Sequence, residues 1–260
     1  MKKPVLHWIK EGQGPLVVLS HALGCDLGMW DGVAAILKNR YTVLRYDHRG
    51  HGCSEAPPGP YTIEMLADDA ANLISAQTDG TVHFVGLSMG GMVAQALAAR
   101  YPQLLKSIVI ANAASWYDDA ARALWQARVQ TVLAQGVAAI ADGAMQRWFT
   151  PEFRADETAG GAARVAALRQ QLEKTDAAAY AASCEAVAGI DFRSSNSRIL
   201  CPALVIAGTR DEATPVPMSQ AICNSIAGAQ LRTLAAAHLS AVEQPEAFVR
   251  LIDTFYTELT

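Results

Sequence analysis

One short segment of the sequence combines a nucleophilic side chain with a turn that would expose it. Residues 82–91 read V-H-F-V-G-L-S-M-G-G, so Ser88 is flanked by Gly86 and Gly90. Neither glycine has a β-carbon to clash in a sharp bend, which lets Ser88 occupy strained backbone with its hydroxyl projecting. The residues before it predict a strand, and the alanine-rich segment Met89–Tyr101 predicts a helix. Strand, turn and helix in this order predict a nucleophilic serine.

A serine hydroxyl is a weak nucleophile at neutral pH, so it needs a base, and the base needs an acid to orient it. After a turn of this kind the acid comes next along the chain and the histidine follows. His238 is the only histidine after Ser88, and it lies in the small-residue segment A-A-A-H-L-S. We therefore expect His238 to be the base; the alternative is a surface or core histidine without a catalytic role.

The acid is expected in the segment L-V-I-A-G-T-R-D-E, where a predicted strand ends at Asp211 and Glu212. A loop of this type commonly presents the first acid after its turn, so we expect Asp211 to orient the histidine and Glu212 to face solvent. Asp191, in A-G-I-D-F-R, is a rival that also fits a turn or a helix cap. The remaining alternative is that Asp211 only caps the helix that follows it.

The negative oxygen that forms during attack on a carbonyl needs preorganised amide donors. One is expected from Met89, the residue after the serine, and the other from the loop L-S-H-A-L-G-C that follows the first parallel strand. We expect Leu23 to supply the second amide, with Ala22 as the alternative one residue earlier.

A histidine-rich loop, Y-D-H-R-G-H-G-C-S, follows the next strand. It fits a structural loop anchored by Asp47 and Arg49, or a metal site. No further ligand cluster completes such a site, so we expect the structural role and no metal. The serine chemistry itself requires no cofactor.

Short apolar runs separated by helical patterns predict an α/β fold, with a mostly parallel sheet and helices on both faces. The strands are expected at Leu16–Leu19, Thr42–Tyr46, Val82–Leu87, Ser107–Ala111, Ala203–Ala207 and Leu231–Leu234. The helices are expected at Trp30–Lys38, Thr62–Ala76, Met89–Tyr101, Pro217–Ile226 and Gln244–Leu259.

Two segments depart from that alternation. Val5–Lys10 is expected to add an antiparallel strand at the sheet edge. Residues 115–198 contain no convincing strand, and they are expected to form a helical lid inserted into a core made of residues 1–114 and 199–260. One helix face in the lid is marked by Trp125, Val129, Val132 and Leu133.

Composition excludes several classes of protein. The chain has 260 residues and is 51% hydrophobic, enough to bury one large core. No apolar run approaches the ~20 residues that span a bilayer. A net charge of −4 argues against nucleic-acid binding. Residues 1–10 lack the pattern of a signal peptide, and five widely spaced cysteines suit reduced thiols. We expect a cytoplasmic protein that acts on small molecules.

The ordered motifs resemble the α/β-hydrolase fold over the whole chain, and within it they are similar to 3-oxoadipate enol-lactonases of aromatic catabolism. The segments that carry the resemblance are L-G-C-D-L-G-M-W-D at 23–31, L-R-Y-D-H-R-G-H-G at 44–52, G-L-S-M-G-G at 86–91, R-W-F-T-P-E-F at 147–153, Y-A-A-S-C-E-A-V at 180–187 and A-A-H-L-S-A-V-E at 236–243. The chain departs from that family's pattern where S-H-A-L-G replaces S-N-S-L-G and where His48 replaces a smaller residue.

The resemblance implies that an ester or lactone is hydrolysed through an acyl-enzyme, with 3-oxoadipate as the product. A broad carboxylesterase or a carbon–carbon bond hydrolase would use the same three residues with a different pocket. A receptor that binds a small molecule without turnover is the alternative from another class. Haloalkane dehalogenation needs a carboxylate nucleophile where this chain has Ser88.

An enol-lactone of this pathway carries a free carboxylate, which a pocket must pair with a cation or with oriented donors. The lid segment R-W-F-T-P-E-F offers Arg147 and Trp148, with Pro151 expected to end their helix. The alternative is that Trp148 only packs the lid and that Arg147 is a solvated charge at a helix end.

Overall fold

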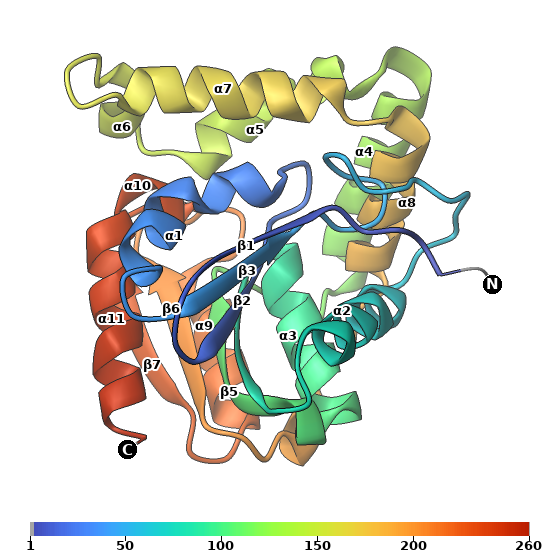
Figure 1. Ribbon diagram of the computed structural model, residues 1–260. Helices are drawn as coiled ribbons and strands as arrows, with labels where there is room; N and C mark the ends of the chain where they lie inside the picture. The colour runs from blue at the N-terminus through green and yellow to red at the C-terminus, as the bar shows by residue number, and fades with distance from the viewer. Residues whose placement is uncertain (1–2, 260) are drawn as a thin grey trace.

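The computed structural model describes residues 3–259, and its centre is a seven-stranded sheet in the order β1-β3-β2-β4-β5-β6-β7 (Figure 1). Every neighbouring pair is parallel except β1 with β3, which is antiparallel. The strands are β1 (Trp8–Gly12), β2 (Leu16–Ser20), β3 (Thr42–Tyr46), β4 (Val82–Leu87), β5 (Leu105–Ala111), β6 (Ala203–Gly208) and β7 (Gln230–Leu234). The predicted mostly parallel sheet is confirmed.

Helices cover both faces of the sheet, which explains why every residue of β4 and β6 is buried. Helices α1 and α11 pack together on one side, and α2 and α3 pack together on the other (Figure 1). The core helices are α1 (Asp31–Leu37), α2 (Ile63–Gln77), α3 (Met89–Arg100), α9 (Val216–Ser225), α10 (Ser240–Glu243) and α11 (Pro245–Thr257). Shorter 3₁₀ turns are η1 (Leu27–Trp30), η2 (Pro102–Leu104), η3 (Val137–Ile140) and η4 (Asn196–Arg198).

Local sequence explains where the helices begin. Thr62 caps α2 by accepting a hydrogen bond from the amide of Met65, and Asp118 caps the long helix α4 through the amide of Ala121. The apolar face of α11 turns toward the core, as expected of an amphipathic helix. There the ring centroids of Phe248 and Trp30 lie 5.9 Å apart. Within the described residues, no helix is both long and apolar enough to cross a membrane.

Five helices lie between β5 and β6. They are α4 (Asp119–Gln135), α5 (Ala141–Trp148), α6 (Pro151–Ala155), α7 (Gly161–Lys174) and α8 (Ala177–Ala188). Helices α5, α6 and α7 form a layer across the top of the molecule in Figure 1, and α4 packs along α8 at its right. An isolated antiparallel bridge between Trp116 and Asp191 joins the two ends of this segment.

Three local expectations need correction. The edge strand runs over Trp8–Gly12 instead of Val5–Lys10, because the amide of Val5 bonds to the carboxylate of Glu55 while Trp8 is the first residue to pair with β3. Leu133 is 56% exposed, so it does not share the buried face of α4. Pro151 does not end the helix of Arg147, since α5 has already ended at Trp148 and Pro151 begins α6.

Candidate active site

Ser88 lies at the corner between β4 and α3, with φ of 57° and ψ of −116°. Residues other than glycine rarely adopt these backbone angles, so the backbone of Ser88 is strained. The hydrogen bond from the Ser88 amide to the carbonyl of Ala111 stabilises this conformation. A β-carbon on Gly86 would lie 2.0 Å from the carbonyl oxygen of Gly90, and one on Gly90 would lie 2.0 Å from that of Ser20. The turn therefore requires both glycines.

Loops from three strand ends bring Ser88, His238 and Asp211 together. The Ser88 hydroxyl lies 2.9 Å from Nε2 of His238, and Nδ1 of His238 lies 2.9 Å from Oδ2 of Asp211. A carboxylate can only accept, so Nδ1 carries the proton and Nε2 is free to accept from the hydroxyl. All three residues are buried. The arrangement can remove a proton from the serine as it attacks a carbonyl.

Asp211 is fixed as an anion by its surroundings. Its Oδ1 accepts the amides of Ala213 and Thr214, and its Oδ2 accepts Nδ2 of Asn112 and the Thr214 hydroxyl as well as His238. Burial alone would raise the pKa of this carboxyl, but the facing His238 and these hydrogen bonds lower it to about 2. The acid therefore stays charged across the neutral range.

The two alternative acids lie elsewhere. Glu212 is exposed and lines a separate polar cavity behind Asp211. Asp191 is exposed, pairs with Arg193, and belongs to the bridge with Trp116 at the neck of the lid. Neither carboxylate is hydrogen-bonded to His238, so the geometry favours Asp211.

Two amides are available to a negative oxygen beside Ser88. Met89 is the first residue of α3, where amides have no partner within the helix. In the loop after β2, the Ala22 amide faces Sδ of Met29 at 3.3 Å, whereas no described residue accepts the amide of Leu23. This difference favours Leu23 over Ala22 as the second donor.

Buried histidines hold that loop in place. Nδ1 of His21 donates to the carbonyl of Ala22, and its Nε2 accepts the amide of His48. His51 donates from Nδ1 to the carbonyl of Arg49 and accepts the Gly24 amide at Nε2. Each ring uses one nitrogen as donor and the other as acceptor, so both are neutral. Burial lowers the pKa of each, that of His51 to about 3.

The histidine-rich loop is anchored by its charged residues. Asp47 accepts the amides of Leu27 and Cys53, and Arg49 forms a two-bond ion pair with Asp69. Ligand atoms of His7, Asp47 and Cys53 lie within 4.8 Å of one another. Oδ2 of Asp47 accepts hydrogen bonds from His7 and from the Cys53 amide, so hydrogen bonding accounts for the close approach of these three residues.

A cavity of about 360 Å³ opens above Ser88, His238, Leu23 and the start of α3, roofed by the lid. Its size falls in the range usual for small-molecule sites. Its lid side combines aromatic rings with two cations, and the lining residues from this segment include Trp125, Arg128, Arg147, Trp148 and Tyr180. Burial, and then the charge of Arg128, lower the pKa of Arg147. Among the described residues, neither arginine forms an ion pair with an acid.

Sequence reasoning missed two residues that the structure places at this site. Asn112, at φ of 48°, joins Asp211 to Ser240, and a contact across 99 residues leaves no local signal. The sequence does contain a pattern from which Arg128 could have been predicted as a site residue. It lies on the same face of α4 as Trp125, and its guanidinium lies 4.6 Å from the centroid of that ring, so one cation interrupts an apolar stripe.

Comparisons with known proteins cover both the core and the lid. A model of the alpha/beta hydrolase fold family matches residues 15–245. The 3-oxoadipate enol-lactonase 2 of Acinetobacter baylyi is 39% identical over 239 residues, covering 92% of this chain and 87% of that protein. The 3-oxoadipate enol-lactonase 1 of the same organism is 35% identical over 243 residues, covering 93% of this chain and 88% of that protein.

Among solved structures, the enol-lactonase from Burkholderia xenovorans LB400 is 37% identical. It superimposes with a TM-score of 0.92 over 98% of this chain and 97% of that one. The likeness therefore includes the segment 115–198 that roofs the cavity.

Proposed function

The chain belongs to the α/β hydrolase fold family, and we propose that it opens the ring of 3-oxoadipate enol-lactone through an acyl-enzyme on Ser88. Support comes from the enol-lactonases that are 35% to 39% identical over most of the chain. The observation that carries the substrate assignment is the pair of arginines, Arg128 and Arg147, in the cavity that contains Ser88. An anionic lactone gives both cations a carboxylate partner.

In the first half of the reaction His238 takes the proton of Ser88 as the hydroxyl attacks the lactone carbonyl. Asp211 holds the imidazole in the required tautomer and stabilises the imidazolium. The amides of Met89 and Leu23 stabilise the tetrahedral oxyanion. Collapse of that intermediate breaks the ring carbon–oxygen bond, and His238 protonates the enolate that leaves.

In the second half His238 activates a water molecule, which attacks the acyl group and releases Ser88. The freed enol becomes a ketone, which makes ring opening effectively irreversible. The net change adds one water to the lactone and gives 3-oxoadipate. This chemistry is supplied by protein groups alone.

The lid has a defined task in this proposal. Residues 115–198 close the cavity and bring Arg128 and Arg147 toward the substrate carboxylate, while Trp148 packs against its carbon skeleton. A buried carboxylate without a partner would be costly, whereas a charge-assisted hydrogen bond is worth about 1.5–3 kcal/mol. We also place the enzyme in the cytoplasm, since all five cysteines are free and suit a reducing compartment.

Replacement of each arginine tests this proposal. We expect Arg128→Ala and Arg147→Ala each to raise KM for the enol-lactone by about tenfold to a hundredfold, because each removes one charge-assisted bond. Neither should change KM for phenyl acetate, which is neutral. Steady-state hydrolysis of both substrates by purified enzyme gives the comparison.

Arg122→Ala is the matched control. Arg122 is an exposed arginine of the same helix as Arg128, and it does not line the cavity. The control should leave both substrates unaffected. Equal losses on lactone and phenyl acetate in the cavity variants would mean that the arginines support the lid and do not bind the carboxylate.

A further inference from the structure

A second cavity, also of about 360 Å³, lies next to the catalytic one, where the lid meets α9. We call it the outer groove, and its lining is Ser115, Trp116, Tyr117, Asp118, Ala121, Pro217, Met218 and Ala221. Three of these residues, Tyr117, Ala121 and Met218, also line the catalytic cavity. The two spaces therefore share a wall, and the outer groove adjoins the site of chemistry.

The chemistry of the outer groove differs from that of the catalytic cavity. Its lining contains no cation, and its only charged residue, Asp118, uses its carboxylate to cap α4 through the Ala121 amide. Trp116 supplies a large apolar surface, and the guanidinium of Arg193, 4.4 Å from its ring centroid, covers one face of the indole. An uncharged apolar group suits this lining, and an anion does not.

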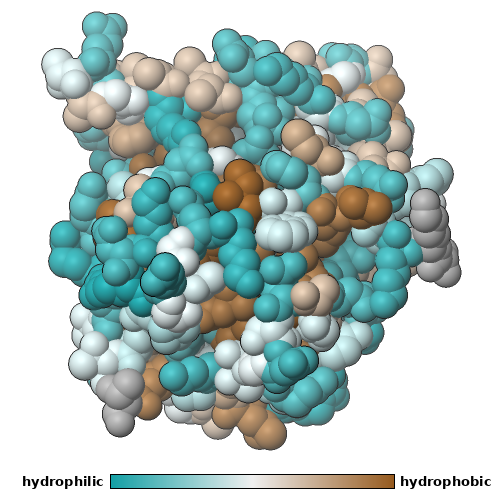
Figure 2. All heavy atoms as spheres, in the orientation of Figure 1, coloured by the Kyte–Doolittle hydropathy of each residue, from teal (hydrophilic) through white to brown (hydrophobic). Residues whose placement is uncertain are grey.

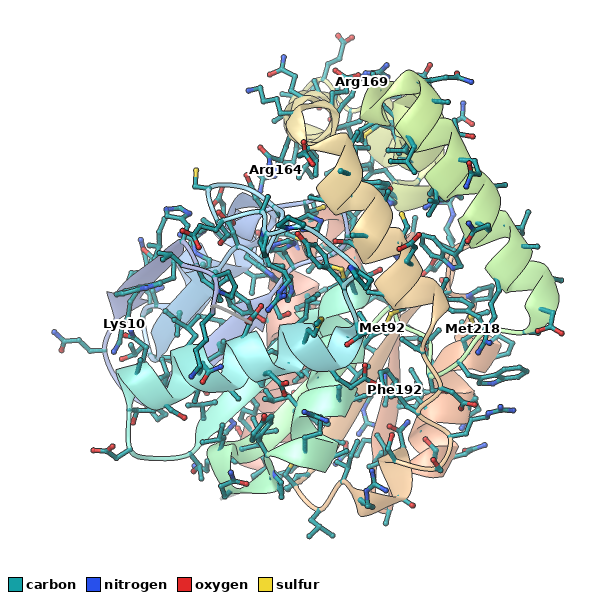
Figure 3. All side chains as sticks on the ribbon, turned by 90° about the vertical axis from the view of Figure 1, so that its right-hand side faces the viewer. Lys10, Met92, Arg164, Arg169, Phe192 and Met218 are labelled. Carbon is teal, nitrogen blue, oxygen red and sulfur yellow. The ribbon has the colours of Figure 1, made fainter. Side chains whose placement is uncertain are left out.

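Met218 is the movable part of the shared wall. Tyr117 is buried and its ring packs at 6.0 Å against Trp125, so its position is fixed. Met218 is only half-buried at the start of α9, and an unbranched thioether can change rotamer without moving the backbone. Figure 3 shows Met218 and Met92 where the core meets the lid helices. Of Tyr117 and Met218, Met218 is therefore the wall residue whose side chain can move.

We propose that the outer groove binds an apolar arm of a neutral ester whose carbonyl is attacked by Ser88. The enzyme then has a second substrate class, esters with an extended alkyl or aryl group, and Met218 sets the boundary between that class and a compact lactone. The chemistry is that of the lactone reaction. Ser88 takes the acyl group, the alcohol leaves with the proton from His238, and water releases the acid. The inference rests on the proposed role of Ser88 but not on the lactone.

Two ester series test this inference in the full-length protein. In p-nitrophenyl esters from acetate to octanoate the acyl arm grows, and in phenyl and naphthyl acetate the leaving arm grows. We expect kcat/KM of the wild type to rise in one series, by about threefold per methylene if the acyl arm enters the groove. Flat or falling profiles in both series would overturn the proposal.

A variant that fills the outer groove tests whether the dependence of kcat/KM on ester size arises there. Ala221 is exposed on α9 and lines only the outer groove, so Ala221→Trp should lower the ratio of kcat/KM between the longest and shortest ester at least tenfold. Gln220→Trp adds the same bulk to an exposed neighbour outside the groove, and it should leave that ratio unchanged. An unchanged ratio in Ala221→Trp would overturn the proposal.

Met218→Ala gives an independent test that removes bulk instead of adding it. It should raise the same ratio about tenfold by opening the shared wall, and an equal change across the series would count against the boundary role. Failure of the lactone assignment is distinguishable from failure of this one. Loss of lactone turnover with the chain-length dependence intact would refute only the lactone. Rapid lactone turnover with no dependence on ester size would refute only the outer groove.

Discussion

At the scale of single residues, Asp211 gives His238 one tautomer and one orientation. Its carboxylate receives five hydrogen bonds from protein groups, and its pKa is lowered to about 2. An amide at this position could donate to Nδ1, which would place the imidazole proton on Nε2, facing the serine. The base would then be lost although the geometry remained.

Asp211→Asn is therefore expected to lower kcat by about a thousandfold to ten-thousandfold with the fold intact. Glu212→Gln is the matched neighbour and should change kcat less than twofold, because Glu212 has no contact with His238. Steady-state kinetics on an aryl acetate, with circular dichroism as the check on folding, gives both values. A large loss in Glu212→Gln with a small one in Asp211→Asn would move the acid by one residue.

Residue type and chain order pointed to Ser88, Asp211 and His238, because the chemistry restricts both, and the folded chain brings these three side chains within hydrogen-bond distance. The sequence favoured Leu23 but left Ala22 open as the second amide, since the distinction depends on the thioether of Met29 facing one amide in the folded chain. Asn112 was missed for the same reason. Its partners come from remote segments, and only the folded chain brings them together.

At the scale of elements, the turn between β4 and α3 sets the position of Ser88. The backbone passes so close to Ser20 that a methyl group on Gly90 has no space. Any side chain there must displace β2 or α3, and β2 leads directly into the loop that contains Ala22 and Leu23. The same turn therefore affects both the stability of the fold and the position of Ser88.

Gly90→Ala is expected to lower the free energy of unfolding by about 3 kcal/mol, the cost of forcing an extra methyl into packed backbone. The control is Gly80→Ala, where the nearest atom to a new β-carbon is the Thr78 hydroxyl at 3.5 Å. Urea unfolding of both variants gives the comparison. Equal stabilities would show that the turn relaxes around the added methyl.

Strands and helices with a strong hydrophobic pattern could be predicted closely from the sequence. Elements whose ends depend on contacts with a neighbouring element could not. Buried strands such as Ala203–Gly208 have apolar runs bounded by turn residues. The edge strand was placed too early in the chain, because its ends are set by pairing with β3 and by the bond between Val5 and Glu55. Leu133 fits a helical stripe by spacing, yet the neighbours of α4 leave it exposed.

At the scale of the whole molecule, the buried core is mainly apolar. On the face drawn in Figure 2, hydrophilic residues predominate and hydrophobic ones appear between them. Besides His238, the interior contains four buried histidines, His21, His48, His51 and His83. Burial lowers the pKa of each, to about 3 for His51 and about 4 for His83.

This burial makes stability depend on pH. Below the ordinary histidine pKa of about 6.5 the unfolded chain binds protons that the folded chain does not, so folding becomes less favourable as pH falls. For His51, whose pKa is lowered to about 3, the free energy of unfolding should fall by about 1.4 kcal/mol per pH unit between about pH 6 and 4.5. The lowered pKa values of the other three buried histidines act in the same direction. Burial raises the pKa of Asp26, Asp69 and Glu243, which opposes this trend in the acid range.

Urea unfolding at pH 7.5, 7, 6 and 4.5 measures the dependence. We expect little change between about pH 7.5 and 7 and a steepening loss below about pH 6, as the sign of the four histidine shifts requires. Stability that stayed level down to pH 4.5 would mean that the buried rings accept protons without cost.

The central claim is that Ser88 opens an anionic lactone in a cavity lined by two arginines. Its most direct test is kcat/KM for 3-oxoadipate enol-lactone beside phenyl acetate, measured with one preparation of purified enzyme and with Ser88→Ala as the blank. Two charge-assisted bonds available only to the lactone predict a preference of at least about a hundredfold, and the blank should show no turnover above buffer. Phenyl acetate hydrolysed as efficiently as the lactone, or lactone turnover retained by Ser88→Ala, would contradict the account.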